Sequence, residues 1–221
     1  MKELYFSPST IDAKAQEMLR KAGTSQRSHS LQYPLESSAL LVLDMQGYFL
    51  DPSSHAFIPS GRTIIPRLGE LVKACSKRGM PVIFTRHLNS AQDAGQMATW
   101  WRELITVELP SSRVIPELDL STGIVLEKSQ YDAFYNTPLE GILRSKGVRQ
   151  VIIGGVMTHL CCETTARSAF MRGFEVFFLV DGSATYHEGY HMASLLNLSH
   201  GFACLKLVKE IMGDLERENA D

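Results

Sequence analysis

Residues 151–172 read VIIGGVMTHLCCETTARSAFMR, and this stretch contains the transition that decides the fold. It opens with an apolar run over residues 151–153, passes through Gly154 and Gly155, and continues as a helical pattern over residues 159–172. An apolar run without polar alternation is typical of a strand that is covered on both faces of a parallel sheet. A strand that leads into a helix is the unit from which doubly wound α/β folds are built.

The same succession of strand and helix recurs along most of the chain. Strands are expected at residues 39–43, 81–85, 123–126, 151–153, 176–180 and 203–207. Helices are expected at residues 64–78, 137–145, 159–172 and 187–198. Right-handed crossovers between parallel strands then give a three-layer α/β/α, Rossmann-like fold with a doubly wound, mainly parallel six-stranded sheet.

The first 37 residues do not share this pattern. A cap at Ser9 and a stop at Gly23 bound a predicted helix, and a polar loop follows at residues 24–30. The apolar face of this helix consists of Ile11, Ala15, Met18 and Leu19. We expect an N-terminal helical arm over residues 1–37, packed on the domain or on another subunit, and a single domain over residues 38–221.

Composition excludes several classes of protein. Hydrophobic residues make up 44% of the 221 residues, charged residues 21%, and the formal net charge is -2, which gives no reason to expect a nucleic acid or membrane partner. Four cysteines without CxxC spacing suit neither a disulfide scaffold nor a zinc ribbon and favour a reducing compartment. No signal-peptide pattern and no apolar run of about 20 residues is present. We therefore expect a cytoplasmic protein.

Three reactive side chains follow three different predicted strands. Asp44 follows the first, Lys128 the third and Cys161 the fourth. Ligands of open α/β sheets bind at the carboxyl ends of the strands, near the switch in strand order. Alone, each residue has an ordinary explanation, since an Asp can cap a turn, a Lys is usually solvated and a Cys on a buried helix is usually core. Their combination indicates a catalytic site.

The motifs around these residues resemble those of the isochorismatase-like cysteine hydrolases, a family that includes nicotinamidases, N-carbamoylsarcosine amidases and isochorismatases. The matching pieces are residues 43–46 with Phe49, Lys128 with Tyr131, Phe134 and residues 137–139, and residues 155–158 with Cys161 and residues 165–166. The resemblance covers about residues 39–207. It implies the isochorismatase-like hydrolase fold, and together with the N-terminal arm it favours a homo-oligomer. No organic cofactor is expected.

The resemblance also implies roles for the individual residues. Cys161 would be the nucleophile, and Asp44 the general base that later protonates the leaving amine. The Lys128 ammonium and the start of a helix would stabilise the thiolate. The N–H groups of Met157 and Cys161 would form the oxyanion hole, presented by a cis peptide before Met157. Cys162, about 100° further around the helix, is expected to be a packing residue.

Two reactions compete within this family. Amidase members attack a C–N bond with the cysteine and pass through a thioester, whereas isochorismatases proper commonly carry glycine there and protonate a vinyl ether with an Asp. Residues 159–172 resemble the isochorismatase branch, yet the thiol of Cys161 favours covalent catalysis. We expect a hydrolase that cleaves a small amide through a Cys–Asp–Lys triad. The alternatives are vinyl-ether hydrolysis with Asp44 as the acid, and a non-catalytic member that binds a ligand.

A metal is not expected. Nicotinamidases carry an Asp and two His residues after the second strand, in an arrangement of the type D-x-H-x-x-x-x-H, which holds zinc near the substrate. In residues 85–93 of this chain only His87 remains, and one imidazole is a poor zinc site. The resemblance therefore disfavours nicotinamide as the preferred substrate.

The substrate is expected to be a small molecule bound near the same strand ends. Candidate contacts are Gln46, Phe49, Arg86, Trp100, Trp101, Tyr131 and His159. Arg86 could hold a substrate carboxylate or form a structural ion pair. The two tryptophans lie in a long excursion over residues 86–122, and long loops of this kind usually form a lid or wall. Aromatic walls suit a small planar amide or a cyclic acid.

Overall fold

The computed structural model describes residues 2–23 and 35–217 and contains a parallel sheet in the strand order β3-β2-β1-β4-β5-β6. The strands are β1 (Ser38–Leu43), β2 (Val82–His87), β3 (Ile124–Lys128), β4 (Gln150–Val156), β5 (Glu175–Ala184) and β6 (Cys204–Lys206). Every neighbouring pair is parallel, which confirms the predicted fold class. The strand order reverses between β1 and β4, so the ends of these two strands flank the expected ligand crevice.

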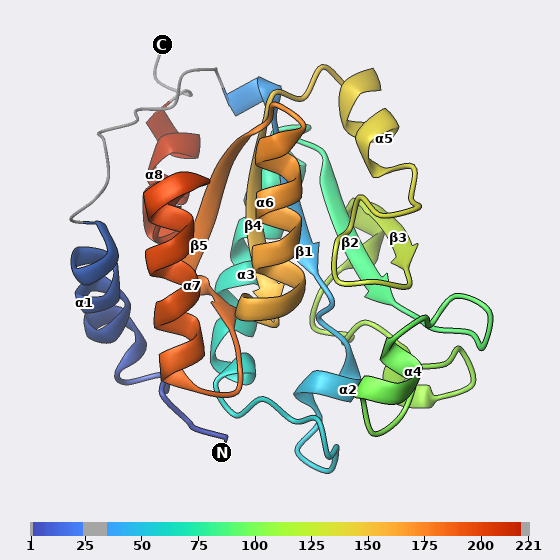
Figure 1. Ribbon diagram of the computed structural model, residues 1–221. Helices are drawn as coiled ribbons and strands as arrows, with labels where there is room; N and C mark the ends of the chain where they lie inside the picture. Colours follow the sequence, from blue (N-terminus) through green and yellow to red (C-terminus); the bar gives the residue numbers. More distant parts are fainter. Residues whose placement is uncertain (1, 24–34, 218–221) are drawn as a thin grey trace.

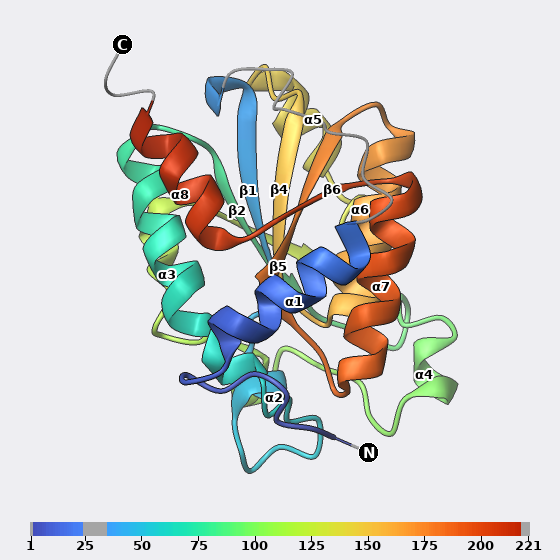
Figure 2. The ribbon, with the colours of Figure 1, turned by 90° about the vertical axis from the view of Figure 1, so that its left-hand side faces the viewer.

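Helices cover both faces of the sheet. Figure 2 shows α3 and α8 on one side of the strands and α6 and α7 on the other, and in Figure 1 α6 and α7 lie in front of the sheet. The helices are α1 (Ile11–Gly23), α2 (Gly47–Leu50), α3 (Gly61–Lys77), α4 (Met97–Trp100), α5 (Leu139–Ser145), α6 (Glu163–Met171), α7 (Glu188–Gly201) and α8 (Val208–Arg217). Helix α8 was not predicted, and it packs against α3. Within the described ranges, no helix is long and apolar enough to cross a membrane.

The central strands β1 and β4 form the core of the sheet. Every residue of both strands is buried, as expected for strands covered on two faces. The two backbones approach closely at Gly155, where φ is +117° and an added Cβ would lie 2.1 Å from Leu43 O. Only glycine fits this position. The close pairing brings the segments that follow β1 and β4 side by side.

The segment after β4 differs from the prediction of a plain α-helix. Residues 158–162 form a π-helical turn, η4 (Thr158–Cys162), and α6 begins only afterwards. The peptide bond between Val156 and Met157 is cis, as the family resemblance implies. The N–H groups of Leu160 and Cys162 both donate to Met157 O, at 3.1 and 3.2 Å. π turns occur frequently at functional sites, and this one carries Cys161.

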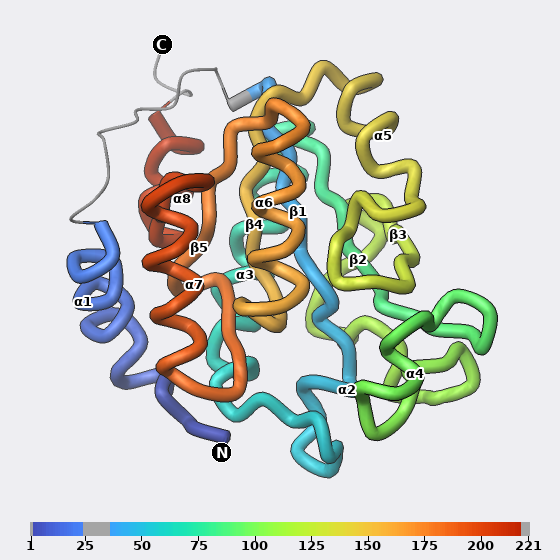
Figure 3. Tube along the Cα trace, viewed as in Figure 1, coloured from blue at the N-terminus to red at the C-terminus, as the bar shows by residue number. Residues whose placement is uncertain are grey.

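Two further segments of the chain lie outside the sheet. Figure 3 shows the chain leaving β2, forming the green loops around α4 and returning to β3. This excursion also contains the 3₁₀ turns η2 (Pro110–Ser112) and η3 (Leu120–Thr122), and a third such turn, η1 (Leu35–Ser37), precedes β1. The arm helix α1 packs on α7 and β5 of its own domain. The polar loop predicted at residues 24–30 lies outside the described residues.

Candidate active site

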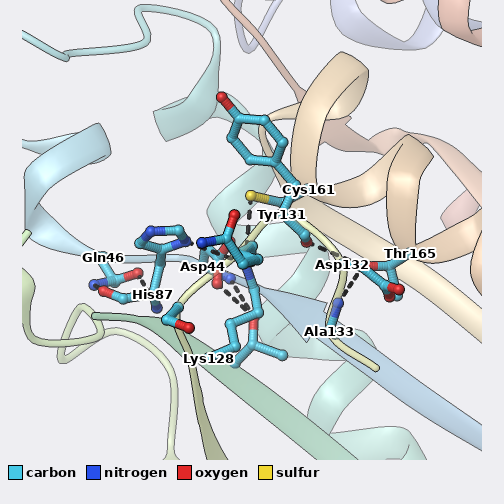
Figure 4. Close-up of polar contacts among 12 residues, drawn as sticks. Asp44, Gln46, His87, Lys128, Tyr131, Asp132, Ala133, Cys161 and Thr165 are labelled. Carbon is cyan, nitrogen blue, oxygen red and sulfur yellow. Dashed lines mark hydrogen bonds and ion pairs between the residues drawn. The ribbon is translucent and has the colours of Figure 1, made fainter. Parts of the chain in front are cut away.

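Asp44, Lys128 and Cys161 meet at the carboxyl end of the sheet. Asp44 follows β1, Lys128 is the last residue of β3, and Cys161 lies in the π turn after β4. Lys128 Nζ is 2.8 Å from Asp44 Oδ2 and 3.4 Å from Cys161 Sγ. Figure 4 shows the Cys161 sulfur directed toward these two residues, and it lies within 4.8 Å of an Asp44 carboxylate oxygen. All three side chains are buried.

The carboxylate of Asp44 is held by the neighbouring strand. The Thr85 hydroxyl donates to Asp44 Oδ1 at 2.5 Å and accepts from Asp44 N–H at 3.0 Å. Asp44 has a φ of +51°, a left-handed conformation that is uncommon outside glycine. Such conformations persist where the surroundings fix them, and they cluster at active sites. Thr85 was not among the predicted site residues.

Lys128 and Asp44 keep each other charged. Burial is the largest influence on Asp44 and would raise its pKa, but the positive charge of Lys128 and the hydrogen bonds to the carboxylate together bring the pKa below its ordinary value. Burial likewise opposes the charge of Lys128, yet the negative charge of Asp44 raises the pKa of Lys128. The pair is therefore an ammonium and a carboxylate at neutral pH.

The thiol of Cys161 is protonated at rest. Burial, and next the negative charge of Asp44, raise the pKa of Cys161 well above its ordinary value. The opposing effect of Lys128 is smaller. For this thiol, burial and the Asp44 charge together exceed the effect of the Lys128 ammonium, to which the resemblance assigned the stabilisation of a thiolate. A nucleophilic thiolate must therefore form by proton transfer.

His87 completes the surroundings of Lys128. Its Nδ1 lies 3.4 Å from Lys128 Nζ, and its Nε2 lies 2.9 Å from Asn89 Oδ1. The Asn89 amide is oriented because its Nδ2 donates to Ser129 O at 2.8 Å. Since an amide oxygen only accepts, His87 carries its proton on Nε2 and turns a lone pair toward Lys128. Burial and the charge of Lys128 lower the pKa of His87 to about 4, so the ring is neutral.

The residues at this site do not fit a metal ion. One ligand atom each from Asp44, His87 and Cys161 lie within 4.8 Å of one another, a spacing that by itself would suit a cation. Lys128 Nζ already contacts all three, at 2.8, 3.4 and 3.4 Å. A zinc ion about 2.0–2.3 Å from the same atoms would overlap the ammonium. Both nitrogens of His87 already contact other side chains, Asn89 and Lys128. The positive charge between these three residues is therefore the ammonium of Lys128.

A cavity of about 160 Å³ borders Cys161. Its wall includes Phe49, Trp101 and Tyr131, three of the predicted substrate contacts, and the Trp101 indole N–H donates to Tyr131 OH at 2.7 Å. The other lining residues are Tyr48, His55, Ala56, His87, Asn89, Met97, Arg102, Glu103, Leu104, Ile105, Met157 and Tyr186. A mostly apolar and aromatic wall with a few polar groups is typical of a small-molecule site.

Gln46 and Arg86, also predicted to contact substrate, do not line this cavity. The Gln46 side chain donates to His87 O and Ser112 O at 3.0 and 2.7 Å and accepts from His87 N–H at 2.8 Å. Arg86 donates to the carbonyl and hydroxyl oxygens of Ser112 and pairs with Glu127 at 3.3 Å. Both side chains attach β2 to the excursion, and Arg86 forms the structural ion pair that was its alternative interpretation.

Trp100 and His159 also lie outside the cavity lining. The Trp100 side chain is 77% exposed, because the short helix α4 turns it outward while the next residue faces inward. His159 contacts Thr185 Oγ1 at 2.7 Å and stacks on Tyr190 with ring centroids 4.7 Å apart. These neighbours hold its ring against the first turn of α7.

Several lining residues were missed because they lie on loops without a periodic pattern. His55 Nε2 is 2.7 Å from Glu103 Oε1 and 3.0 Å from Tyr48 OH, a cluster at the cavity wall. Arg102 also lines the cavity, and within the described part of the chain no hydrogen bond or ion pair holds its guanidinium. For Arg102 and Glu103, the sequence signal that could have found them is their position directly after Trp101.

The Cys162 side chain faces the core and not the cavity. It is fully buried in the hydrophobic cluster, and burial raises its pKa well above the ordinary value. Cys75 is also buried in that cluster. Cys161 is the cysteine that borders the cavity, and it is also the one that the motif spacing assigns as the nucleophile.

Comparisons with known proteins identify the family and the fold of this chain. A model of the isochorismatase domain matches residues 38–208. The chain is 40% identical to "Nicotinamidase 3" of Arabidopsis thaliana over 186 residues, which cover 80% of this chain and 90% of that protein. It is 32% identical to "Enterobactin synthase component B" of Escherichia coli over 163 residues, 72% of this chain and 57% of that protein. A solved cysteine hydrolase from Pseudomonas syringae pv. phaseolicola superposes with a TM-score of 0.80 and 26% identity, covering 86% of this chain and 99% of that one.

Proposed function

The chain belongs to the isochorismatase family of hydrolases, and we propose that it hydrolyses a small amide with Cys161 as the nucleophile. The products are a carboxylic acid and ammonia or an amine. The observation that carries this proposal is the placement of one charged pair, Asp44 and Lys128, against a neutral thiol that borders a cavity. Each of the three groups has a separate task in the reaction.

The first half of the reaction forms a thioester. Asp44 takes the thiol proton, and the sulfur forms a bond to the substrate carbonyl carbon while the carbonyl electron pair moves to oxygen. The N–H groups of Met157 and Cys161 are proposed to receive this oxyanion. When the carbonyl re-forms, the C–N bond breaks, and Asp44 delivers its proton to the leaving nitrogen.

The second half releases the acid. Water attacks the thioester carbonyl while Asp44 takes one of its protons, the C–S bond breaks, and the sulfur recovers a proton. Lys128 remains an ammonium throughout. Lys128 Nζ lies 3.4 Å from Cys161 Sγ. Once Asp44 has taken the thiol proton, the ammonium of Lys128 therefore pairs with the thiolate instead of with the carboxylate. Lys128 also donates to Gln130 O at 2.9 Å, which fixes its position during this exchange.

The vinyl-ether alternative fits the charge state less well. It requires Asp44 to donate a proton at the start, whereas Lys128 keeps the pKa of this carboxyl below its ordinary value. It also leaves the thiol at the cavity without a role. A site that only binds a ligand has no need for a buried ion pair beside a cysteine, because burying charges is costly.

The substrate proposed is a small planar amide. Phe49, Trp101 and Tyr131 offer aromatic surface beside Cys161. The expectation against nicotinamide rested on the missing zinc ligands. The relative named a nicotinamidase makes nicotinamide a necessary member of any test panel, next to pyrazinamide and ureido acids.

Ammonia release from this panel tests the proposal. Wild-type protein should release ammonia from at least one amide, and Cys161→Ser and Asp44→Asn should each lower kcat/KM by at least about 10³-fold, because the removed group acts in the transition state. Cys162→Ala is the matched control, since it removes the adjacent thiol from the core and leaves the cavity unchanged.

Two results would contradict the proposal. Full turnover of an amide by Cys161→Ser would exclude the thioester and leave direct attack by water, with Asp44 as the base, as the route to the acid. The second result is that wild-type protein forms no thioester during turnover and that Cys162→Ala loses as much activity as Cys161→Ser. The loss of activity in the variants would then reflect impaired folding and not the loss of a nucleophile. Mass spectrometry of quenched reactions detects the acyl group and assigns it to one cysteine.

A further inference from the structure

The segment that precedes α1 lies across the carboxyl end of the sheet. Figure 2 shows it, in dark blue, passing below α1 toward the start of α7. We call residues 2–10 the strap. The N–H groups of Tyr5 and Phe6 both donate to Ser60 Oγ, at 2.9 and 3.0 Å, and Glu3 N–H donates to Tyr186 O at 2.7 Å. The strap lies outside the segment matched by the family model, residues 38–208.

One end of the strap contacts two residues that line the cavity. Lys2 donates to the carbonyl of His55, and its ammonium lies 4.7 Å from the centre of the Tyr186 ring. His55 and Tyr186 both line the cavity. Glu3 also pairs with His187 at 3.1 Å and accepts from Glu188 N–H at 2.9 Å, which attaches the strap to the start of α7. The strap therefore contacts His55 and Tyr186, two residues of the cavity wall, without itself lining the cavity.

The middle of the strap carries a buried tyrosine. Tyr5 is 4% exposed, and its hydroxyl accepts from Thr185 N–H at 2.9 Å. The same hydroxyl lies 3.2 Å from His191 Nδ1. Because the oxygen already accepts from a backbone donor, its own proton is free to be donated to the imidazole. A buried hydroxyl that is engaged in both directions is held in a fixed position.

His191 carries this contact to the π turn. Its Nδ1 is also 3.0 Å from Thr158 Oγ1, and Thr158 is the first residue of the turn that holds Cys161. His191 is completely buried, and desolvation lowers its pKa to about 3, so the imidazole is neutral and the hydroxyls of Tyr5 and Thr158 share the single lone pair of Nδ1. Three residues from distant parts of the chain thus form one continuous contact, from Tyr5 through His191 to Thr158.

We propose that the strap is a positioning element of the active site, and that Tyr5 is a positioning residue that holds the Cys161 turn through His191 and Thr158. The proposal rests on the role assigned to Cys161. Tyr5 does not line the cavity, so its effect is transmitted and not a contact with substrate. The strap would then set the orientation of the thiol relative to Asp44 and Lys128.

Alkylation of Cys161 by iodoacetamide measures this orientation without a known substrate. The reaction replaces the S–H bond by an S–C bond with loss of iodide, and it requires the same proton transfer as the proposed catalysis. Tyr5→Phe removes two hydrogen bonds, of which the one to His191 leads to the Cys161 turn, and it should lower the alkylation rate constant about three- to tenfold, the range that corresponds to that one bond. Ile11→Val, a buried change in α1 that removes no hydrogen-bonding group, is the control for lost stability.

A double variant separates positioning from simple destabilisation. Thr158→Val should slow alkylation as well, and Tyr5→Phe combined with Thr158→Val should be no slower than the slower single variant, because both changes break one chain of contacts. A wild-type rate for Tyr5→Phe, an equal loss in Ile11→Val, or effects that multiply would each overturn the proposal. Ammonia release by Cys161→Ser tests the nucleophile separately, so the two proposals can fail independently.

Discussion

The hydroxyl of Thr85 donates a 2.5 Å hydrogen bond to Asp44 Oδ1 and accepts one of 3.0 Å from Asp44 N–H. One side chain of β2 therefore holds both the carboxylate and the backbone of a residue in a left-handed conformation. Lys128 contacts the other carboxylate oxygen at 2.8 Å. The proposed general base is fixed on both sides before any substrate enters, which is the arrangement that proton transfer requires.

Thr85→Val should impair this base without changing the size of the side chain. The pKa of Asp44 should rise, because a hydrogen bond to its charged form is lost. A hydrogen bond to a charged group contributes about 1.5–3 kcal/mol, so kcat/KM should fall roughly 10- to 100-fold. The acid limb of the pH–rate profile should also move to higher pH.

Thr85→Ser is the matched variant for this measurement. It keeps the hydroxyl and should retain the position of the acid limb, with a smaller loss in rate. If the valine and serine variants had the same pH profile, Thr85 would have a packing role only.

The buried pair predicts how folding responds when one charge is removed. Lys128→Met should lower the free energy of unfolding by about 3–5 kcal/mol, because it leaves the Asp44 carboxylate buried and unpaired. Lys128→Met combined with Asp44→Asn should recover much of this loss, although both proteins should be inactive. Urea unfolding of the two variants measures the difference. Losses that simply add would show that the two side chains contribute to stability separately.

The positions of Asp44, Lys128 and Cys161 at one edge could be predicted because parallel strands end on the same side of a sheet. The contact with Thr85 could not, since its hydroxyl lies within an apolar run and its partner depends on the register of β2 against β1. Gln46 shows the same limit. The packing of the excursion decides whether a polar side chain at a strand end faces a ligand or a backbone carbonyl. No periodic sequence pattern predicts that packing.

The acid sensitivity of folding should arise partly from His87. Burial and Lys128 lower its pKa from 6.5 to about 4. As the pH falls, the unfolded chain binds the proton first, so the free energy of unfolding decreases between about pH 6.5 and 4. The loss at pH 5 should be about 2 kcal/mol for this one residue. His191, with a pKa of about 3, should add a second component of the same sign.

His87→Gln should therefore flatten the decrease in stability between pH 7.5 and 5, measured by urea midpoints at several pH values. His200→Gln, at an exposed position on α7, should leave the decrease unchanged. An equal decrease in wild-type protein and His87→Gln would assign the acid sensitivity to other groups.

Arg102 should make the cavity selective for anions. It lines the cavity without a hydrogen bond or ion pair in the described residues, whereas its neighbour Glu103 is paired with His55 at 2.7 Å. Iodoacetate and iodoacetamide are of similar size and differ by one charge, so the ratio of their rate constants with Cys161 reports the local potential. Arg102→Met should lower this ratio about threefold, which corresponds to the roughly 0.7 kcal/mol expected of an exposed charge, and added salt should reduce the difference.

Arg20→Met is the control for this measurement, because it removes the same charge from an exposed position on α1. A lower ratio in both variants would reflect net charge, and an unchanged ratio in Arg102→Met would show that its guanidinium does not act on the cavity. A decrease confined to Arg102→Met has a consequence for the substrate. Amides that carry a carboxylate should then have higher kcat/KM than neutral amides of the same size, and this preference should disappear in the same variant.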